Sequence, residues 1–152
     1  MKYRYEEMTW PEIREAVKED PVVVLPVGTT EQHGYHLPLM VDYLCSGEVA
    51  RAAVEQASPR ALLMHPITYS FNEHHLDFPG TISIDPHVII DYVVCVGQSL
   101  AHHGFKRILL FNGHGSNVPF LDVAARTITN RTSAICAMTS WWSLLRKEDL
   151  AW

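Results

Sequence analysis

Four short apolar runs, separated by stretches with helical periodicity, constrain the fold more than any other feature of this sequence. Their length and their aliphatic residues predict β-strands at residues 22–27, 61–64, 107–111 and 133–138. Capping residues and apolar stripes predict helices at about residues 9–21, 43–57, 85–103 and 117–131, with a short helix in residues 144–152. Successive strands joined through a helix lie parallel, with right-handed connections. The sequence therefore predicts an α/β fold of three layers, α/β/α, in which a mainly parallel sheet of about four strands carries helices on both faces.

Length and composition predict a single domain, spanning residues 1–152. A length of 152 residues is enough for one domain with a core and leaves no room for a second, and a content of 47% hydrophobic residues is typical of a globular protein. The net charge is −5 and no basic run occurs, so we expect no binding to nucleic acid or to a membrane surface. The first residues lack the apolar core of a signal peptide, and no apolar run approaches the roughly 20 residues of a membrane span. We therefore expect a cytoplasmic protein.

The three cysteines, Cys45, Cys95 and Cys136, stand in apolar stretches and show no Cys-x-x-Cys spacing. An odd number of cysteines placed in this way fits a reducing compartment. We therefore expect all three to be reduced core residues.

Possible metal ligands follow the first predicted strand. Glu31 and His33 are two residues apart, and in extended backbone such residues point to the same side of the chain. Asp42 adds a second carboxylate after a loop in which Gly34 and Pro38 can turn the chain back. A single Glu or His in a loop is more often solvated, or a helix cap, than a ligand. Together, the three residues indicate a site for a divalent cation.

A second polar group follows the third predicted strand, where residues 112–117 read NGHGSN. His114 can join Glu31 and His33 only if the first and third strands lie side by side and point the same way. Parallel strands meet this condition, because they bring their carboxyl ends to one edge of a sheet. The amides at the start of the helix that follows could hold an oxyanion or a substrate carboxylate.

Two further stretches could line a pocket. The irregular segment at residues 68–83 contains Glu73 and His74 and is longer than most loops of compact domains, which makes it a candidate pocket wall. The alternative is a solvated loop with a Pro-Gly turn. Trp141 and Trp142 follow the fourth predicted strand and could wall a flat, ring-sized pocket. A subunit contact or the edge of the core is an equally good interpretation of these tryptophans.

In their order along the chain, these segments resemble the creatininase family, that is, creatinine amidohydrolase and its relatives. The matching segments are residues 30–34 (TEQHG), 36–39 (HLPL) with Asp42, 78–81 (FPGT) and 112–117 (NGHGSN). The resemblance implies a two-metal centre with the ligands Glu31, His33, Asp42 and His114. It assigns Glu31, Asp42 and His114 to one cation, and His33 and Asp42 to the other. It also implies that the FPGT segment packs beside the active site.

The resemblance further implies the reaction. We expect a metal-dependent amidohydrolase that hydrolyses a C–N amide bond, in a small cyclic amide, a formamide or a peptide, with a metal-bound hydroxide. Carboxylate and imidazole ligands suit Zn, Mn or Fe(II) without distinguishing them, and we expect up to two ions per subunit. The residues expected to take part in catalysis are Glu31, His114, Glu73 and His74. The residues expected in the substrate pocket are His36, Ser116, Trp141 and Trp142.

Two departures from the family pattern lead to further expectations. In creatininase itself, a Glu two residues after the His of the second motif completes the site; Ser116 stands at that position here, so the second cation is expected to be short of protein ligands. Family members continue into a C-terminal segment with a glycine-histidine-alanine motif and a later glutamate, and we expect this chain to lack that segment. The apolar surface then left around Trp141, Trp142 and Leu144 predicts a homo-oligomer.

Two other functions stay open from the sequence. A truncated member of the family could bind metal or a partner through the same pocket without catalysing a reaction. A serine hydrolase could use Ser116 with His114, but the residues around Ser116 lack the Gly-x-Ser-x-Gly pattern, and no Asp is placed to orient the histidine.

Overall fold

Four parallel strands form the centre of the computed structural model, which describes residues 2–146 and 148. The strands lie in the order β2-β1-β3-β4, with the bounds β1 Val22–Val27, β2 Ala61–Leu63, β3 Arg107–Asn112 and β4 Ile135–Ser140. The α-helices are α1 Trp10–Lys18, α2 Val41–Ala57, α3 Pro86–His102 and α4 Val118–Arg131. The 3-10 helices are η1 Tyr5–Glu7, η2 Glu73–His75, η3 Gly115–Asn117 and η4 Trp141–Leu144. The predicted α/β class with a parallel sheet is confirmed.

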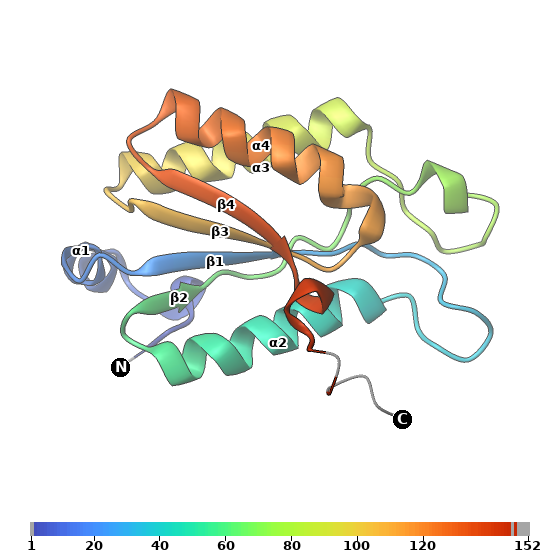
Figure 1. Ribbon diagram of the computed structural model, residues 1–152, viewed down its shortest axis with the longest axis horizontal. Helices are drawn as coiled ribbons and strands as arrows, with labels where there is room; N and C mark the ends of the chain where they lie inside the picture. Colours follow the sequence, from blue (N-terminus) through green and yellow to red (C-terminus); the bar gives the residue numbers. More distant parts are fainter. Residues whose placement is uncertain (1, 147, 149–152) are drawn as a thin grey trace.

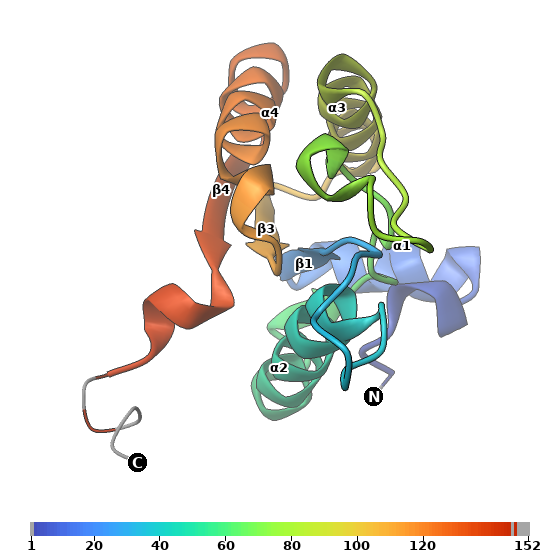
Figure 2. The same ribbon diagram turned by 90° about the vertical axis from the view of Figure 1, so that its right-hand side faces the viewer.

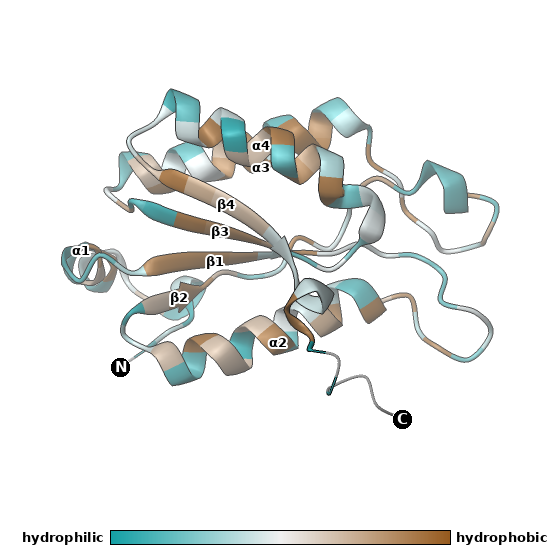
Figure 3. Cartoon of the chain, in the orientation of Figure 1, coloured by the Kyte–Doolittle hydropathy of each residue, from teal (hydrophilic) through white to brown (hydrophobic). Residues whose placement is uncertain are grey.

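Helices cover both faces of the sheet. Figures 1 and 2 show α3 and α4 on one face and α2 on the other. Successive side chains of a strand face opposite ways, so Val23 and Leu25 of β1 join the core under α3 and α4, whereas Val24 packs with Ala50 and Val54 of α2. Apolar residues therefore concentrate on the strands (Figure 3). In the described part of the chain, no helix is both long and apolar enough to cross a membrane.

Local signals explain where two of the helices begin. The Glu12 carboxylate accepts a hydrogen bond from the Thr9 amide at 2.7 Å, just before α1. The Asp85 carboxylate accepts one from the His87 amide at 2.8 Å, just before α3. A proline occupies the first turn of both helices, where its missing N–H is not needed. These are the caps that the sequence predicts.

Several element boundaries differ from the predicted ones, and three of these differences concern the site or the end of the chain. α2 begins at Val41 rather than at residue 43, so Asp42 lies in its first turn. β4 begins and ends two residues later than predicted, because it pairs with β3 as far as Ser140, which lies opposite Asn112. Of the helix predicted in residues 144–152, Leu144 belongs instead to the end of η4, and residues 147 and 149–152 lie outside the described part.

The three cysteines are free, but they differ in burial. Cys136 is buried in the core, and burial raises the pKa of its thiol to about 12. Cys45 is half-buried, and Cys95 is exposed on α3. The prediction of a core position is therefore wrong for Cys95, because the apolar residues around it in the sequence face the sheet while Cys95 faces outward.

The chain changes direction across the sheet at β1. From β1 it passes through α2 to β2 at one edge, and from β2 it returns through α3 to β3 on the other side of β1. The loop after β1 leads to α2 and the loop after β3 leads to α4; these helices lie on opposite faces of the sheet (Figure 1), so the two loops leave in different directions. In open α/β sheets, the crevice between two such loops is the usual place for a ligand.

Candidate metal centre

The loop after β1 folds back on itself and carries three of the predicted ligands. Glu31 and His33 lie in its outgoing part. Gly34 has a φ of +73°, a conformation open to glycine, and the chain then returns so that His33 forms an antiparallel bridge with Leu37. The returning chain enters α2, whose first turn carries Asp42. A local turn thus brings Asp42 back to the end of β1.

Glycines let the first turn of α2 approach the ends of both central strands. A Cβ atom on Gly28, which follows β1, would lie 2.4 Å from the Cα atom of Tyr43. A Cβ atom on Gly113, which follows β3, would lie 2.3 Å from the Asp42 carbonyl oxygen and 2.6 Å from the Ser46 hydroxyl. Both contacts are too close for any side chain unless α2 moves. The absence of side chains at these two positions therefore keeps Asp42 between the strand ends.

Asn112 holds the loop that carries His114. Its side-chain oxygen accepts a hydrogen bond from the His114 amide at 3.0 Å, and its side-chain nitrogen donates to the His114 carbonyl at 2.8 Å. The same nitrogen donates to the Ser140 hydroxyl at 3.0 Å, which ties the loop to the end of β4. Asn112 is fully buried. These bonds satisfy a buried amide and fix the backbone that positions the His114 ring.

Glu31, His33, Asp42 and His114 lie together at this edge of the sheet. His114 Nδ1 lies 2.8 Å from Asp42 Oδ2 and 3.4 Å from Glu31 Oε1. His33 Nε2 lies 3.1 Å from Asp42 Oδ1. One possible ligand atom from each of Glu31, His33 and Asp42 lies within 4.8 Å of the other two. Such a mixed set of carboxylate and imidazole groups suits a first-row divalent cation.

Charge pairing sets the protonation of the buried groups. Burial would lower the pKa of His114, but hydrogen bonds with the carboxylates of Asp42 and Glu31 raise it to about 9. Burial would raise the pKa of Glu31, but His114 above all holds that pKa below its ordinary value. Near neutral pH, a protonated imidazole thus lies against ionised carboxylates. A cation at this place would take the role of that proton.

The loop between β2 and α3 brings two more histidines to the site. His74 and His75 belong to η2. His75 Nε2 lies 3.4 Å from Glu31 Oε2, and His74 Nε2 lies 3.2 Å from Ser116 Oγ. A cavity of about 450 Å³ opens between these groups. Its lining consists of the four clustered residues with Val41, Cys45, His74, His75, Gly113, Gly115, Ser116, Trp141 and Trp142.

The residues predicted for catalysis and for the substrate pocket differ in where they lie. Ser116, Trp141 and Trp142 line the cavity, and the two indole rings meet edge to face with their centroids 5.8 Å apart. His36 and Glu73 are exposed and do not belong to the lining. His36 lies in the turn at the far end of the first loop, and Glu73 begins η2. Neither side chain therefore contributes to the cavity in this structure.

Three residues at the site were not singled out from the sequence. Cys45 follows Asp42 by three positions on α2, and this helical spacing could have placed it on the same side. His75 is adjacent to His74 in the sequence, and this pair of histidines could have indicated that His75 also lies at the site. Gln32 carried no signal, because in an extended chain it points away from its two neighbours. Its side-chain nitrogen nevertheless lies 3.0 Å from His75 Nδ1.

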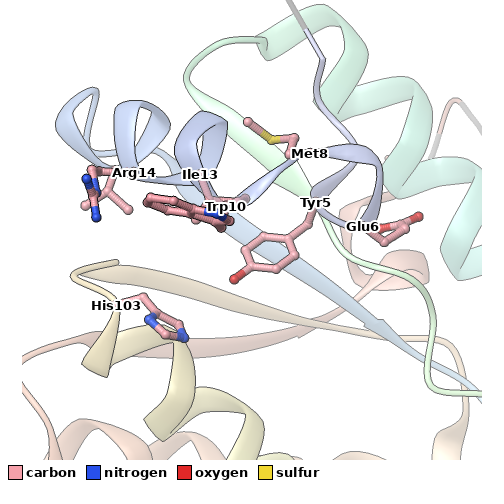
Figure 4. Close-up of a pocket in the computed structure, with 8 residues that line it drawn as sticks. Tyr5, Glu6, Met8, Trp10, Ile13, Arg14 and His103 are labelled. Atoms are coloured by element: carbon pink, nitrogen blue, oxygen red, sulfur yellow. The ribbon is translucent and has the colours of Figure 1, made fainter.

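A second cavity, of about 690 Å³, lies beside α1 at the other end of the sheet. Figure 4 shows Tyr5, Trp10, Arg14 and His103 around it. The Arg14 guanidinium lies 4.6 Å from the centroid of the Trp10 ring. Among the residues that the structure describes, every group of three possible metal ligands contains Glu31. The cavity beside α1 is therefore not a candidate for a cation.

Comparison with known proteins agrees with the geometry of the first cavity. The family model Creatininase, described as creatinine amidohydrolase, matches residues 6–151. This chain belongs to the creatininase family. The resemblance predicted from the sequence motifs is thereby confirmed.

The relatives that are similar to this chain include a peptide peptidase and a creatinine amidohydrolase. It is 42% identical over 108 residues to the mycofactocin precursor peptide peptidase of Mycolicibacterium smegmatis, in a match that covers 68% of this chain and 43% of the relative. It is 35% identical over 132 residues to the creatinine amidohydrolase of Pseudomonas putida, in a match that covers 80% of this chain and 50% of the relative. The chain thus spans about half the length of the curated relatives it matches.

A solved structure named "Creatininase Mn" has the same fold. It superposes with a TM-score of 0.86 at 30% sequence identity, and the match covers 97% of this chain and 61% of that one. The fold described above is therefore shared with that solved structure.

Proposed function

We propose that this protein is a metal-dependent amidohydrolase that hydrolyses a C–N amide bond. The observation that carries the proposal is the contact of one ring nitrogen of His114 with the carboxylates of both Glu31 and Asp42. These three groups come from different elements and meet at the crevice where an α/β sheet takes its ligands. A creatinine amidohydrolase and a peptide peptidase among the relatives support a cyclic amide or a peptide as the substrate. A formamide is a third candidate, on the family resemblance alone.

The residues present fit a divalent cation. Among the described residues, no hydrogen-bond partner is found for the buried Nε2 atom of His114, and a buried polar atom is unfavourable unless something satisfies it. Glu31, Asp42 and His114 would hold one cation, and His33 with Asp42 a second. A divalent cation bound there would lower the pKa of a water molecule and polarise the carbonyl group of the substrate. Zn, Mn and Fe(II) all suit this donor set.

His74 and Ser116 provide a group that can move a proton beside the cluster. Partial desolvation, together with the neighbouring histidine rings, lowers the pKa of His74, so its ring is neutral near neutral pH. The contact between His74 Nε2 and the Ser116 hydroxyl keeps the ring at the cavity. A neutral imidazole can accept a proton from water and pass it to the leaving nitrogen. Trp141 and Trp142 add flat apolar walls that suit a planar amide.

Ser116 sets this chain apart from creatininase at the second cation. A serine hydroxyl is a weaker ligand than a carboxylate, and here it contacts His74. We therefore expect one firmly bound cation and a second that binds more weakly.

Metal removal and reloading test the proposed reaction. The protein is stripped with a chelator, reloaded with Zn, Mn or Fe(II), and assayed on creatinine, on a formamide compound and on peptides. We expect hydrolysis of at least one substrate after reloading and none after stripping. Metal binding without hydrolysis would favour a non-catalytic member that binds metal or a partner. Failure to bind any of the three metals would contradict the proposal.

The pairing of Ser116 with His74 makes a serine hydrolase the second candidate. Its histidine would then be His74 rather than His114, since His114 Nδ1 is engaged by carboxylates. Ser116→Ala separates the two mechanisms. A serine hydrolase would lose all activity in this variant, and the wild type would be blocked by a serine-directed reagent. A metal-dependent enzyme would keep part of its activity, lowered because His74 loses its contact with Ser116, and would be sensitive to a chelator.

A further inference from the structure

Two groups of possible metal ligands share Glu31. One consists of Glu31, His33 and Asp42, and the other of Glu31, His74 and His75; in each group, the ligand atoms lie within 4.8 Å of one another. Distances alone do not decide whether His75 is a ligand of a cation. The hydrogen bonds around Gln32 do decide it, because they determine which nitrogen of His75 carries a proton.

The orientation of the Gln32 amide follows from the Gly34 backbone. The Gly34 amide donates a hydrogen bond to Gln32 Oε1 at 3.0 Å. A backbone N–H can only donate, so the Gln32 atom that faces it must be the oxygen. The nitrogen of the same side chain then faces His75 Nδ1, at 3.0 Å.

The tautomer of His75 follows from the orientation of Gln32. An amide nitrogen can only donate, so His75 Nδ1 must accept the hydrogen bond. A neutral imidazole with an accepting Nδ1 carries its proton on Nε2. That N–H faces Glu31 Oε2 at 3.4 Å. Glu31 Oε2 is buried, and no hydrogen-bond partner is found for it among the described residues.

We propose that Gln32 holds His75 as an N–H donor toward Glu31, which makes His75 a positioning residue of the Glu31 carboxylate and not a metal ligand. The proposal rests on the proposed function only for the role of Glu31. A ligand histidine must turn a ring nitrogen without a proton toward the cation, and the nitrogen of His75 that faces Glu31 carries one. Glu31 is then held from both sides, with Oε1 facing His114 and Oε2 facing His75. Of the two groups, only the one with His33 and Asp42 then supplies metal ligands.

The tautomer can be measured in the metal-free protein by nitrogen NMR of the histidine rings, at alkaline pH, where neutral imidazole predominates. We expect Nδ1 of His75 without a proton and Nε2 with one. In Gln32→Leu, which removes the donor, the second tautomer should become populated at His75 but not at His114. A wild-type His75 with its proton on Nδ1, or a tautomer that does not respond to Gln32→Leu, would overturn the proposal.

Metal stoichiometry separates a positioning residue from a ligand. We expect His75→Ala to bind as many cations per chain as the wild type, with affinity lower by about 10- to 100-fold, as is usual for residues that orient a ligand. His75→Gln, whose amide N–H can replace the Nε2–H donor, should recover most of this affinity. The loss of one cation in both variants would mean that His75 is a ligand, and unchanged affinity in His75→Ala would mean that it positions nothing. If the wild type binds no metal, the proposed function fails, while the NMR result still decides the tautomer.

Discussion

His114 combines two different environments in one imidazole ring. Its Nδ1 atom contacts two carboxylates, while its Nε2 atom is buried and has no hydrogen-bond partner within the part of the chain that the structure describes. The backbone on either side is held by Asn112 rather than by packing of the ring. The ring therefore acts through its charge and its nitrogen atoms, which are the properties that metal binding uses.

Replacing His114 with Ala should weaken metal binding, since it removes one of four proposed ligands. The metal-loaded variant should keep a melting temperature close to that of the loaded wild type, because the cation still pairs with the carboxylates. The metal-free variant should lose about 1–3 kcal/mol, because Glu31 and Asp42 lose their buried partner. Elemental analysis and thermal unfolding of both forms measure these effects. Unchanged metal content together with a lowered melting temperature would show that His114 is only structural.

In the metal-free protein, His114 should also make stability depend on pH. Its pKa is raised from the ordinary value of 6.5 to about 9 in the folded state. A group whose pKa is raised by folding stabilises the fold fully below its unfolded pKa, and this contribution is lost as the pH rises through the folded pKa. The free energy of unfolding should therefore fall between about pH 6.5 and pH 9. Denaturant unfolding across this range should give a flatter profile for His114→Gln, and coincident profiles would contradict the prediction.

The elements at the site are arranged by the close approach of α2 to the strands. Gly28 and Gly113 sit where β1 and β3 end, and both face the first turn of α2. Gly115 lies in the same loop as Gly113, but a Cβ atom there would meet nothing within 4 Å. Gly113, which is tightly packed, and Gly115, which faces open space, therefore form a matched pair for substitution.

Gly113→Ala should move the first turn of α2 and carry Asp42 away from His114. We expect a loss of about 1–3 kcal/mol in the free energy of unfolding, which is typical of overpacking, together with weaker metal binding. Gly115→Ala is the control, and it should change both quantities little. The measurements are denaturant unfolding and metal titration of the two variants. Equal effects in both would mean that the approach of α2 is not what positions Asp42.

At the scale of the whole molecule, one edge of the sheet is less covered than the rest. β4 is an edge strand, and in Figure 2 it stands apart from α2. Ile135 of β4 is 69% exposed, and Leu144 of η4 is 60% exposed. Exposed apolar residues at an unpaired strand edge are typical of an interface.

We expect the protein to self-associate through this edge, and Ile135→Lys to weaken the association. Lysine on an edge strand opposes pairing through its charge. Val123→Lys, on an exposed position of α4 that is 48% accessible, is the control. Sedimentation at micromolar concentration should show an oligomer for the wild type and for Val123→Lys, and a smaller species for Ile135→Lys. A monomeric wild type would contradict the prediction.

The sequence by itself determined the layers of this fold and the family. The strands of a sheet covered on both faces are continuous apolar runs, so β1 and β3 could be recognised from composition alone. Glu31, His33 and His114 could be singled out because they directly follow such runs, at the edge where parallel strands end together. Each of these features lies within a few consecutive residues, so it can be recognised without knowing which distant residues are in contact.

Only the tertiary structure decided which side chains meet across long separations. The partner of Ser116 is His74, 42 residues away, and the partner of Gln32 is His75, 43 residues away. The burial of Cys95 and the end of β4 were likewise misjudged, because they depend on which helix face and which strand lie alongside. Such contacts follow from the order of the strands and the path of the loops, so no local pattern of residues specifies them.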